Sequence, residues 1–180
     1  MKIYTNLPVH YWINRPLGNL KGVKQKMKSR IEKIKEIEEL RIEGKKIIFT
    51  NGCFDIMHVG HLRYLKKAKE FGEILIIGLN TDNSIKRIKG DKRPIIPEDE
   101  RAELLEELRC VDYVIMFDED TPVDLVAELK PDVYVKGGDY TIDQLPEAKI
   151  VHSYNGEVKI VNFIEGRSTT SIIKRIKELT

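Results

Sequence analysis

Cysteine is scarce in this chain of 180 residues, which contains only Cys53 and Cys110. The two cysteines lie far apart in the sequence, and neither belongs to a Cys-x-x-Cys pair. The sequence therefore offers no disulfide framework and no cysteine-based zinc motif. Isolated thiols of this kind are typical of a reducing compartment, and we expect a cytoplasmic protein.

Long apolar runs and a strong excess of charge are also missing. No segment approaches the roughly 20 consecutive apolar residues of a membrane span. Prolines and polar residues interrupt the N-terminal stretch where a signal peptide would lie. The formal net charge of +2 is too small to indicate a nucleic-acid partner. We therefore expect neither a membrane nor a nucleic acid as the partner.

The N-terminal part differs in pattern from the rest of the chain. Residues 1–20 hold the single tryptophan, Trp12, and show little periodicity. From Lys21 to Glu43, apolar residues recur every three or four positions, which predicts an amphipathic helix that ends at Gly44. The first half of this helix is rich in lysine, which we interpret as a solvated face rather than a site for an anionic partner. The predicted division is an accessory extension at residues 1–44 and a main domain at residues 45–180.

After residue 44, short β-branched runs alternate with helical stretches, a pattern typical of an α/β domain. The pattern predicts a Rossmann-like, doubly wound parallel sheet, in which ligands bind at the carboxyl ends of the strands. The expected strands are 46–50, 74–79, 113–117, 133–136 and 159–161. The expected helices are 59–71, 82–88, 98–108, 122–129 and 169–179.

The glycine fingerprint of dinucleotide-binding proteins, G-x-G-x-x-G, is absent after the first expected strand. That strand instead runs through Thr50-Asn51-Gly52-Cys53-Phe54-Asp55 to His58-Val59-Gly60-His61, where a helix begins. The first N–H groups of a helix attract anions, and a glycine there leaves room for a phosphate. Histidines three residues apart face nearly the same side. This turn is predicted to bind a phosphate.

Two other interpretations of the histidines stay open at this point. His58 could serve only as a helix cap while His61 packs or faces solvent. A zinc site is disfavoured, because the pair lacks a supporting cluster of acidic residues. We predict no metal ion bound by protein ligands alone.

Further motifs follow in the later loops. They are Asn80-Thr81-Asp82, Lys89-Gly90-Asp91-Lys92-Arg93-Pro94, Glu100-Arg101, Lys136-Gly137-Gly138-Asp139-Tyr140 and Glu165-Gly166-Arg167-Ser168-Thr169-Thr170-Ser171. In this order, from Lys45 to the C-terminus, they resemble the nucleotidyltransferases that carry an H-x-G-H motif, the cytidylyltransferase-like family. Within that family the chain looks most like the bacterial D-glycero-β-D-manno-heptose 1-phosphate adenylyltransferases.

The resemblance implies a reaction and its partners. ATP and heptose 1-phosphate would give ADP-heptose and pyrophosphate, a step toward lipopolysaccharide or other surface glycans, with Mg²⁺ supplied as MgATP. Such enzymes are often the C-terminal half of a fusion with a sugar kinase, and we expect the stand-alone form here. Members commonly form dimers or larger oligomers, so a homo-oligomer is an expected partner.

The resemblance also implies which residues form the site. His58 and His61 would donate hydrogen bonds to ATP phosphates in the transition state, and Lys89 would add positive charge. The predicted nucleotide-binding residues are Thr50, Asn51, Gly52, Cys53, Phe54, Gly60, Gly137, Arg167, Ser168, Thr169 and Thr170. The predicted substrate-binding residues are Asp55, Asp82, Arg101, Gly138 and Asp139.

Two alternatives accompany this expectation. One is another adenylyl or cytidylyl transferase, of the glycerol-3-phosphate cytidylyltransferase type or of the FAD synthase type, which shares an Ile-Ile-Pro-Glu stretch like 95–98. Phe163-Ile164 stand where the glycerol-phosphate enzymes carry arginine and threonine, which counts against that type. The second is a non-catalytic, nucleotide-binding regulatory module, which the intact histidine pair disfavours.

Overall fold

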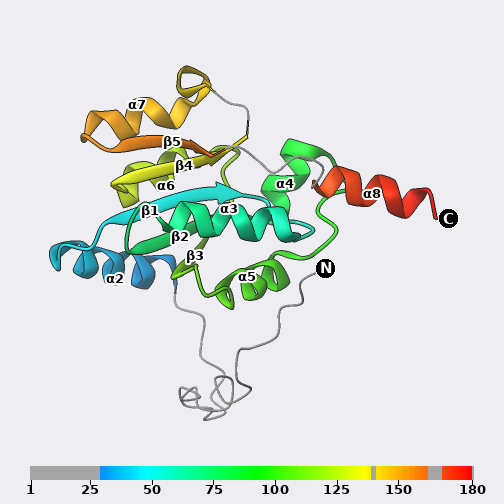
Figure 1. The fold of residues 1–180 in the computed structure, drawn as a ribbon, viewed down its shortest axis with the longest axis horizontal. Coiled ribbons are helices and arrows are strands. Elements are labelled where there is room, and N and C mark those ends of the chain that lie inside the picture. Colours follow the sequence, from blue (N-terminus) through cyan, green and yellow to red (C-terminus); the bar gives the residue numbers. More distant parts are fainter. Residues whose placement is uncertain (1–28, 139–140, 162–167, 180) are drawn as a thin grey trace, which may run out of the picture.

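The structure is a computed structural model that describes residues 29–138, 141–161 and 168–179. Five parallel strands form one sheet in the order β3-β2-β1-β4-β5 (Figure 1). The strands are β1 (Ile47–Gly52), β2 (Ile74–Asn80), β3 (Tyr113–Phe117), β4 (Val133–Gly137) and β5 (Glu157–Val161). The predicted Rossmann-like, doubly wound α/β fold is confirmed, and every predicted strand overlaps an observed one.

The helices alternate with these strands along the chain. They are α2 (Arg30–Ile42), α3 (Val59–Lys69), α4 (Asp82–Lys89), α5 (Glu98–Glu106), α6 (Val123–Leu129), the 3-10 helix η1 (Ile142–Gln144), α7 (Pro146–Ser153) and α8 (Thr169–Lys177). The sequence patterns did not predict η1 and α7. Helix α7 is short, and its buried Ala148 and Val151 pack into the core, so tertiary packing selects its conformation more than periodicity does.

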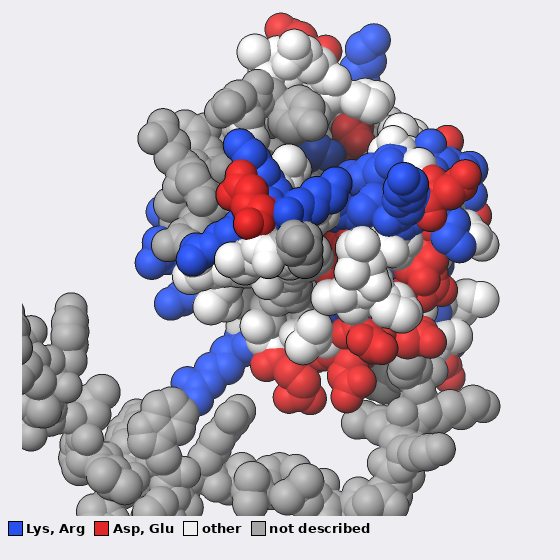
Figure 2. All heavy atoms as spheres, turned by 90° about the vertical axis from the view of Figure 1, so that its right-hand side faces the viewer, with Lys and Arg blue, Asp and Glu red and all other residues white. Residues whose placement is uncertain are grey.

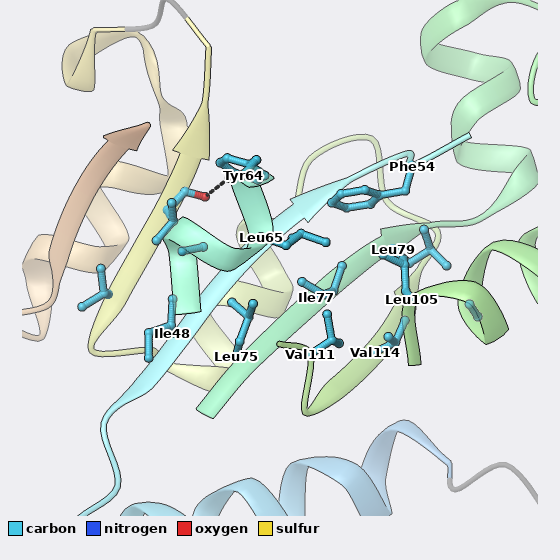
Figure 3. Close-up of a cluster of buried hydrophobic side chains, with 14 residues drawn as sticks. Ile48, Phe54, Tyr64, Leu65, Leu75, Ile77, Leu79, Leu105, Val111 and Val114 are labelled. Atoms are coloured by element: carbon cyan, nitrogen blue, oxygen red, sulfur yellow. Dashed lines mark hydrogen bonds between the residues drawn. The ribbon is translucent and has the colours of Figure 1, made fainter. Parts of the chain in front are cut away.

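Two apolar clusters cover the two faces of the sheet. On one face, Ile48 and Ile77 pack with Leu65 of α3 and Leu105 of α5 (Figure 3). On the other face, the second cluster joins the sheet to α2, α6 and α7. Side chains alternate along each strand, so the parity of a strand residue decides which face it serves.

Helix α2 is part of this packing. Its Ile37 is 1% exposed and belongs to the second cluster. The Lys33 ammonium donates to the carbonyl of Val114 at 2.7 Å, and the Arg41 guanidinium donates to the carbonyls of Leu129 and Lys130. The second half of the predicted N-terminal helix is therefore packed against the sheet domain; residues 21–28 lie outside the described part.

The central strands separate at their carboxyl ends. The register of β1 and β4 pairs Ile48 with Val133 and Phe49 with Tyr134, although both strands continue beyond these pairs. The Tyr64 hydroxyl from α3 lies between the strands there: it is 2.6 Å from the Thr50 hydroxyl and donates to the Val135 carbonyl at 3.0 Å. Strand order reverses between β1 and β4, which is where ligands bind in doubly wound sheets.

Among the residues described, no helix is both long and apolar enough to cross a bilayer.

Candidate active site

A cavity of about 470 Å³ opens where β1 and β4 separate. This volume lies within the range of small-molecule sites. Of the predicted site residues, the following line it: Asn51, Gly52, Cys53, Phe54, Asp55, His61, Lys89, Gly137 and Thr169. The carboxyl ends of the two strands and the starts of α3 and α8 thus meet at one hollow, as the fold predicts.

The histidine pair sits at the first turn of α3. His58 is the N-cap, and its Nδ1 accepts a hydrogen bond from the Gly60 N–H at 3.1 Å. In the neutral imidazole, this leaves the proton on Nε2. The rings of His58 and His61 are stacked with centroids 3.9 Å apart, and the rings of Phe54 and His61 meet edge to face with centroids 5.4 Å apart. His58 is thus a helix cap, as one interpretation held, and the stacking holds both imidazoles together beside the helix start.

His61 is held in its neutral form. Burial, and to a lesser extent the neighbouring charges of His58 and Lys89, together lower the pKa of His61 to about 4. Its Nδ1 is buried and has no hydrogen-bond partner among the described residues. Such an atom lacks the compensation that buried polar groups normally receive. An anion beside this ring would offset the repulsion from His58 and Lys89.

We expect the depressed pKa of His61 to appear in the pH dependence of stability. The unfolded chain takes up this proton near pH 6.5 and the folded chain near pH 4, so the contribution is present above pH 6.5 and is lost as the pH falls toward 4. In urea unfolding between pH 7 and 4, His61→Asn should weaken this dependence by up to one proton. An unchanged pH dependence would contradict the depressed pKa.

Lys89 adds positive charge at the rim of the cavity. It ends α4, whose last turn also holds Lys86 and Arg87, and α8 carries Lys174, Arg175 and Lys177 in its last turn. These two helices lie at the same side of the molecule (Figure 1). Seen from that side, Lys and Arg side chains gather across the face and acidic side chains lie mainly below them (Figure 2). The charge favours approach of an anionic ligand.

The start of α8 supplies hydroxyl groups. Ser168 is the N-cap, and its Oγ accepts from the Ser171 N–H at 3.1 Å. Thr169 lines the cavity, and its hydroxyl donates a long hydrogen bond to the Ile56 carbonyl at 3.4 Å. Ser168 and Thr170 are not among the lining residues, so Thr169 is the residue of this group that the structure brings to the hollow.

Arg101 has a different position from the predicted substrate contact. It is fully buried, and its guanidinium donates to the carbonyls of Cys53 at 2.6 Å, Asn80 at 3.0 Å and Ile96 at 2.9 Å, and to the carboxylate of Asp82 at 2.6 Å. These groups lie at the ends of β1 and β2 and in the loop before α5. Arg101 therefore positions the cavity wall, and in this arrangement neither it nor Asp82 lines the cavity.

Asp55 also acts within the wall. Its carboxylate is 2% exposed, pairs with Arg93, and accepts from the N–H groups of Ile95 and Ile96 at 2.8 and 2.9 Å. These bonds satisfy the carboxylate without a ligand and fasten the loop that carries Arg93. Arg93 lines the cavity, so Asp55 positions a cation there rather than offering free oxygens to a substrate.

Of the remaining predicted residues, three lie away from the cavity lining and two lie outside the described part of the chain. The Thr50 hydroxyl is hydrogen-bonded to the Tyr64 hydroxyl, and Gly60 is buried in α3. Gly138 has a φ of +117°, a conformation that favours glycine, and its N–H donates to the Val161 carbonyl. None of these three lines the cavity. Asp139 and Arg167 lie outside the described residues.

The sequence interpretation missed part of the cavity wall on the α7 face. Lys136 follows Tyr134 by two residues on β4 and therefore lies on the same face, where its ammonium donates to the Asn51 side-chain oxygen at 3.3 Å. Glu147 of α7 lines the same region and is 2% exposed. A lysine within an otherwise buried parallel strand was the available signal. Glu147 gives no separate signal, because an acidic residue directly after a proline is typical of any helix start.

The donor set gives a metal ion little to bind by itself. The described residues contain no group of three His, Cys, Asp or Glu side chains that could hold a metal ion. Mg²⁺ often keeps several waters and binds through substrate phosphates and one or two carboxylates.

This chain is similar in sequence to several known proteins. The bifunctional protein HldE of Geobacter sulfurreducens is 55% identical over 136 residues, which are 76% of this chain and 28% of that protein. HldE of Geobacter metallireducens is 56% identical over 140 residues, covering 78% of this chain and 29% of that protein. The chain thus spans less than a third of the length of these relatives.

A solved structure and a family model extend the comparison. The lipopolysaccharide core biosynthesis protein from Thermoplasma volcanium is 33% identical, with a TM-score of 0.55, and the match covers 69% of this chain and 100% of that chain. The model of the cytidylyltransferase-like family matches residues 49–175, which include both histidines, Lys89 and the start of α8. Because this match covers well over half of the sequence, the chain belongs to the cytidylyltransferase-like family.

Proposed function

We propose that this protein is a nucleotidyltransferase that moves AMP from ATP to D-glycero-β-D-manno-heptose 1-phosphate, giving ADP-heptose and pyrophosphate. The observation that carries the proposal is the stacked histidine pair at the start of α3, of which His61 lines the cavity together with Lys89, while His58 is not among the lining residues. The choice of heptose rests on the later motifs and agrees with a relative named for lipopolysaccharide core biosynthesis. The proposal places the protein in the cytoplasm, where ATP is available.

The cavity suits an in-line displacement. An oxygen of the sugar phosphate attacks the α-phosphorus of ATP, a new P–O bond forms, and the bond to the bridging oxygen breaks as pyrophosphate leaves. Negative charge grows on the oxygens around phosphorus and on the leaving group. The N–H groups at the start of α3, the imidazoles and Lys89 would stabilise this negative charge by hydrogen bonds and by positive charge.

The protein needs no covalent intermediate for this reaction. The sugar phosphate is already a nucleophile, so His58 and His61 act as hydrogen-bond donors, and we assign them no proton transfer. Lys89 and Arg93 at the rim would hold the departing pyrophosphate or the acceptor phosphate. Mg²⁺, when bound with ATP, would neutralise charge on the phosphates.

The proposal is tested by pyrophosphate release from the purified protein. ATP and CTP are each offered with heptose 1-phosphate, glycerol 3-phosphate and flavin mononucleotide, and reactions without an acceptor serve as controls. We expect turnover with ATP and heptose 1-phosphate to exceed every other pair. Preferred turnover of another pair would overturn the substrate assignment, and nucleotide binding without turnover of any pair would favour a regulatory module.

A further inference from the structure

The cavity has a second wall, on the opposite face of the sheet from the histidines. His61 lies on α3, which covers one face of the sheet together with α5. Asn51, Lys136 and Glu147 belong to the other face: the two strand residues share parity with Phe49 and Tyr134, and α7 packs there through Ala148 and Val151. The same cavity contacts both walls. We call Asn51, Lys136 and Glu147 the α7 wall.

The opposite wall of the cavity holds His61, and we call it the histidine wall. The chemistry of the α7 wall differs from that of the histidine wall. Glu147 is 2% exposed, and its Oε2 is buried with no hydrogen-bond partner among the described residues. A carboxylate only accepts hydrogen bonds, and leaving a buried one unsatisfied is costly. The start of α7 favours a negative charge at this position, but the helix dipole supplies no donor to this oxygen. A donor from a ligand would.

Lys136 completes the polar surface. Its ammonium donates to the Asn51 side chain and to the Tyr134 hydroxyl at 3.2 Å. Burial lowers the pKa of Lys136, while the nearby Glu147 opposes that shift. The α7 wall thus holds the Glu147 carboxylate, which is a strong acceptor, the Lys136 ammonium, which is a cation, and the side-chain amide of Asn51. This combination suits vicinal hydroxyl groups, which donate to the carboxylate and accept from the ammonium.

A phosphate fits this wall poorly, because Glu147 would repel it. The Asp55 and Asp120 carboxylates that also line the cavity are paired with Arg93 and Arg87, whereas Glu147 has an oxygen without a partner among the described residues. The two walls therefore separate an anionic part of the ligands from an uncharged, hydroxylated part. We propose that the α7 wall binds the sugar hydroxyls of the acceptor, with Glu147 as the residue that determines acceptor specificity. This inference rests on the proposed nucleotidyl transfer to a sugar phosphate.

Glu147→Gln tests the inference, because it keeps the shape of the side chain and removes the charge. Hydrogen bonds to charged groups are worth enough to change affinity about 10- to 100-fold. We expect KM for heptose 1-phosphate to rise by that factor, while KM for ATP stays within about twofold and kcat at saturation changes little. The midpoint of thermal unfolding is measured alongside, because the variant removes the unpartnered Oε2 but also the negative charge beside the buried Lys136 ammonium. Glu147→Asp, which withdraws the carboxylate, should raise the same KM.

The control is Glu157→Gln, an exposed glutamate at the first residue of β5, far from the carboxyl ends of the strands; it should behave like the wild type. A rise in KM for ATP alone would assign Glu147 to the nucleotide, whose ribose also carries vicinal hydroxyls, and would overturn the inference, as would unchanged KM values for both substrates. Wild-type turnover is measured first. If another hydroxylated acceptor is preferred, the heptose assignment fails, and the same variants measured with that acceptor decide the role of Glu147.

Discussion

His61→Ala should slow pyrophosphate release by about 10²- to 10³-fold while leaving the thermal unfolding midpoint nearly unchanged. This is the loss typical of removing one preorganised donor from a developing oxyanion. The imidazole lines the cavity, stacks on His58 and stays neutral because its pKa is about 4. Once the nucleotide phosphates lie beside it, their negative charge favours the protonated imidazolium, which donates from both ring nitrogens and which the free protein disfavours. The effect should therefore fall mainly on kcat.

Stability should change little, for a specific reason. The alanine variant loses ring packing against Phe54 and His58, but it also removes a buried Nδ1 that has no partner among the described residues. These contributions oppose each other. His152→Ala on the exposed part of α7 is the matched control and should keep wild-type turnover. If His61→Ala turned over at the wild-type rate, the histidine pair would have only a structural role.

Arg101→Met should lower the free energy of unfolding by about 3–5 kcal/mol, the usual loss when one partner is removed from a buried charged network. The side chain of methionine fills much of the same space, but it leaves the carbonyls of Cys53, Asn80 and Ile96 without the donor they now have. It also leaves the Asp82 carboxylate without its guanidinium partner. Urea unfolding followed by circular dichroism measures the change.

Arg87→Met on α4 is the control, because Arg87 pairs with Asp118 and Asp120 at the surface, where such pairs contribute little. Its unfolding midpoint should stay close to that of the wild type. The kinetic result separates the two roles of Arg101. If Arg101 bound the substrate directly, Arg101→Met would raise KM without a large loss of stability, and that outcome would support the substrate contact predicted from the sequence.

The arrangement of the site also explains how one small domain could handle two charged substrates. The histidine wall and the basic rim favour phosphates, whereas the Glu147 carboxylate in the α7 wall would repel them. Opposite preferences on the two faces of one sheet would orient the acceptor with its phosphate toward the α-phosphorus of ATP. Correct orientation of the reactants is itself a large part of catalysis.

Several local features could be predicted from the sequence because they depend on neighbours in the chain. The period of the apolar residues predicted all five strands and six of the described helices, and the change from strand to helix at Thr50–His61 predicted an anion site. In both cases the physics is short-range: side-chain alternation in a strand, and the free N–H groups of a first helical turn. Helix α7 was not predicted, because its apolar pattern is short and the segment becomes helical through contacts with the rest of the core.

By itself the sequence determined the parallel α/β fold, the histidine turn and the family that its motifs resemble. Only the tertiary structure decided which charged residues face the cavity. Arg101 and Asp55 belong to motifs that the sequence assigns to the site. In the structure, however, Arg101 donates hydrogen bonds to backbone carbonyls and Asp55 accepts them from backbone N–H groups, all within the cavity wall. Lys136 and Glu147 are brought together from β4 and α7. Burial and hydrogen-bond partners depend on residues far apart in the chain, and no local pattern records them.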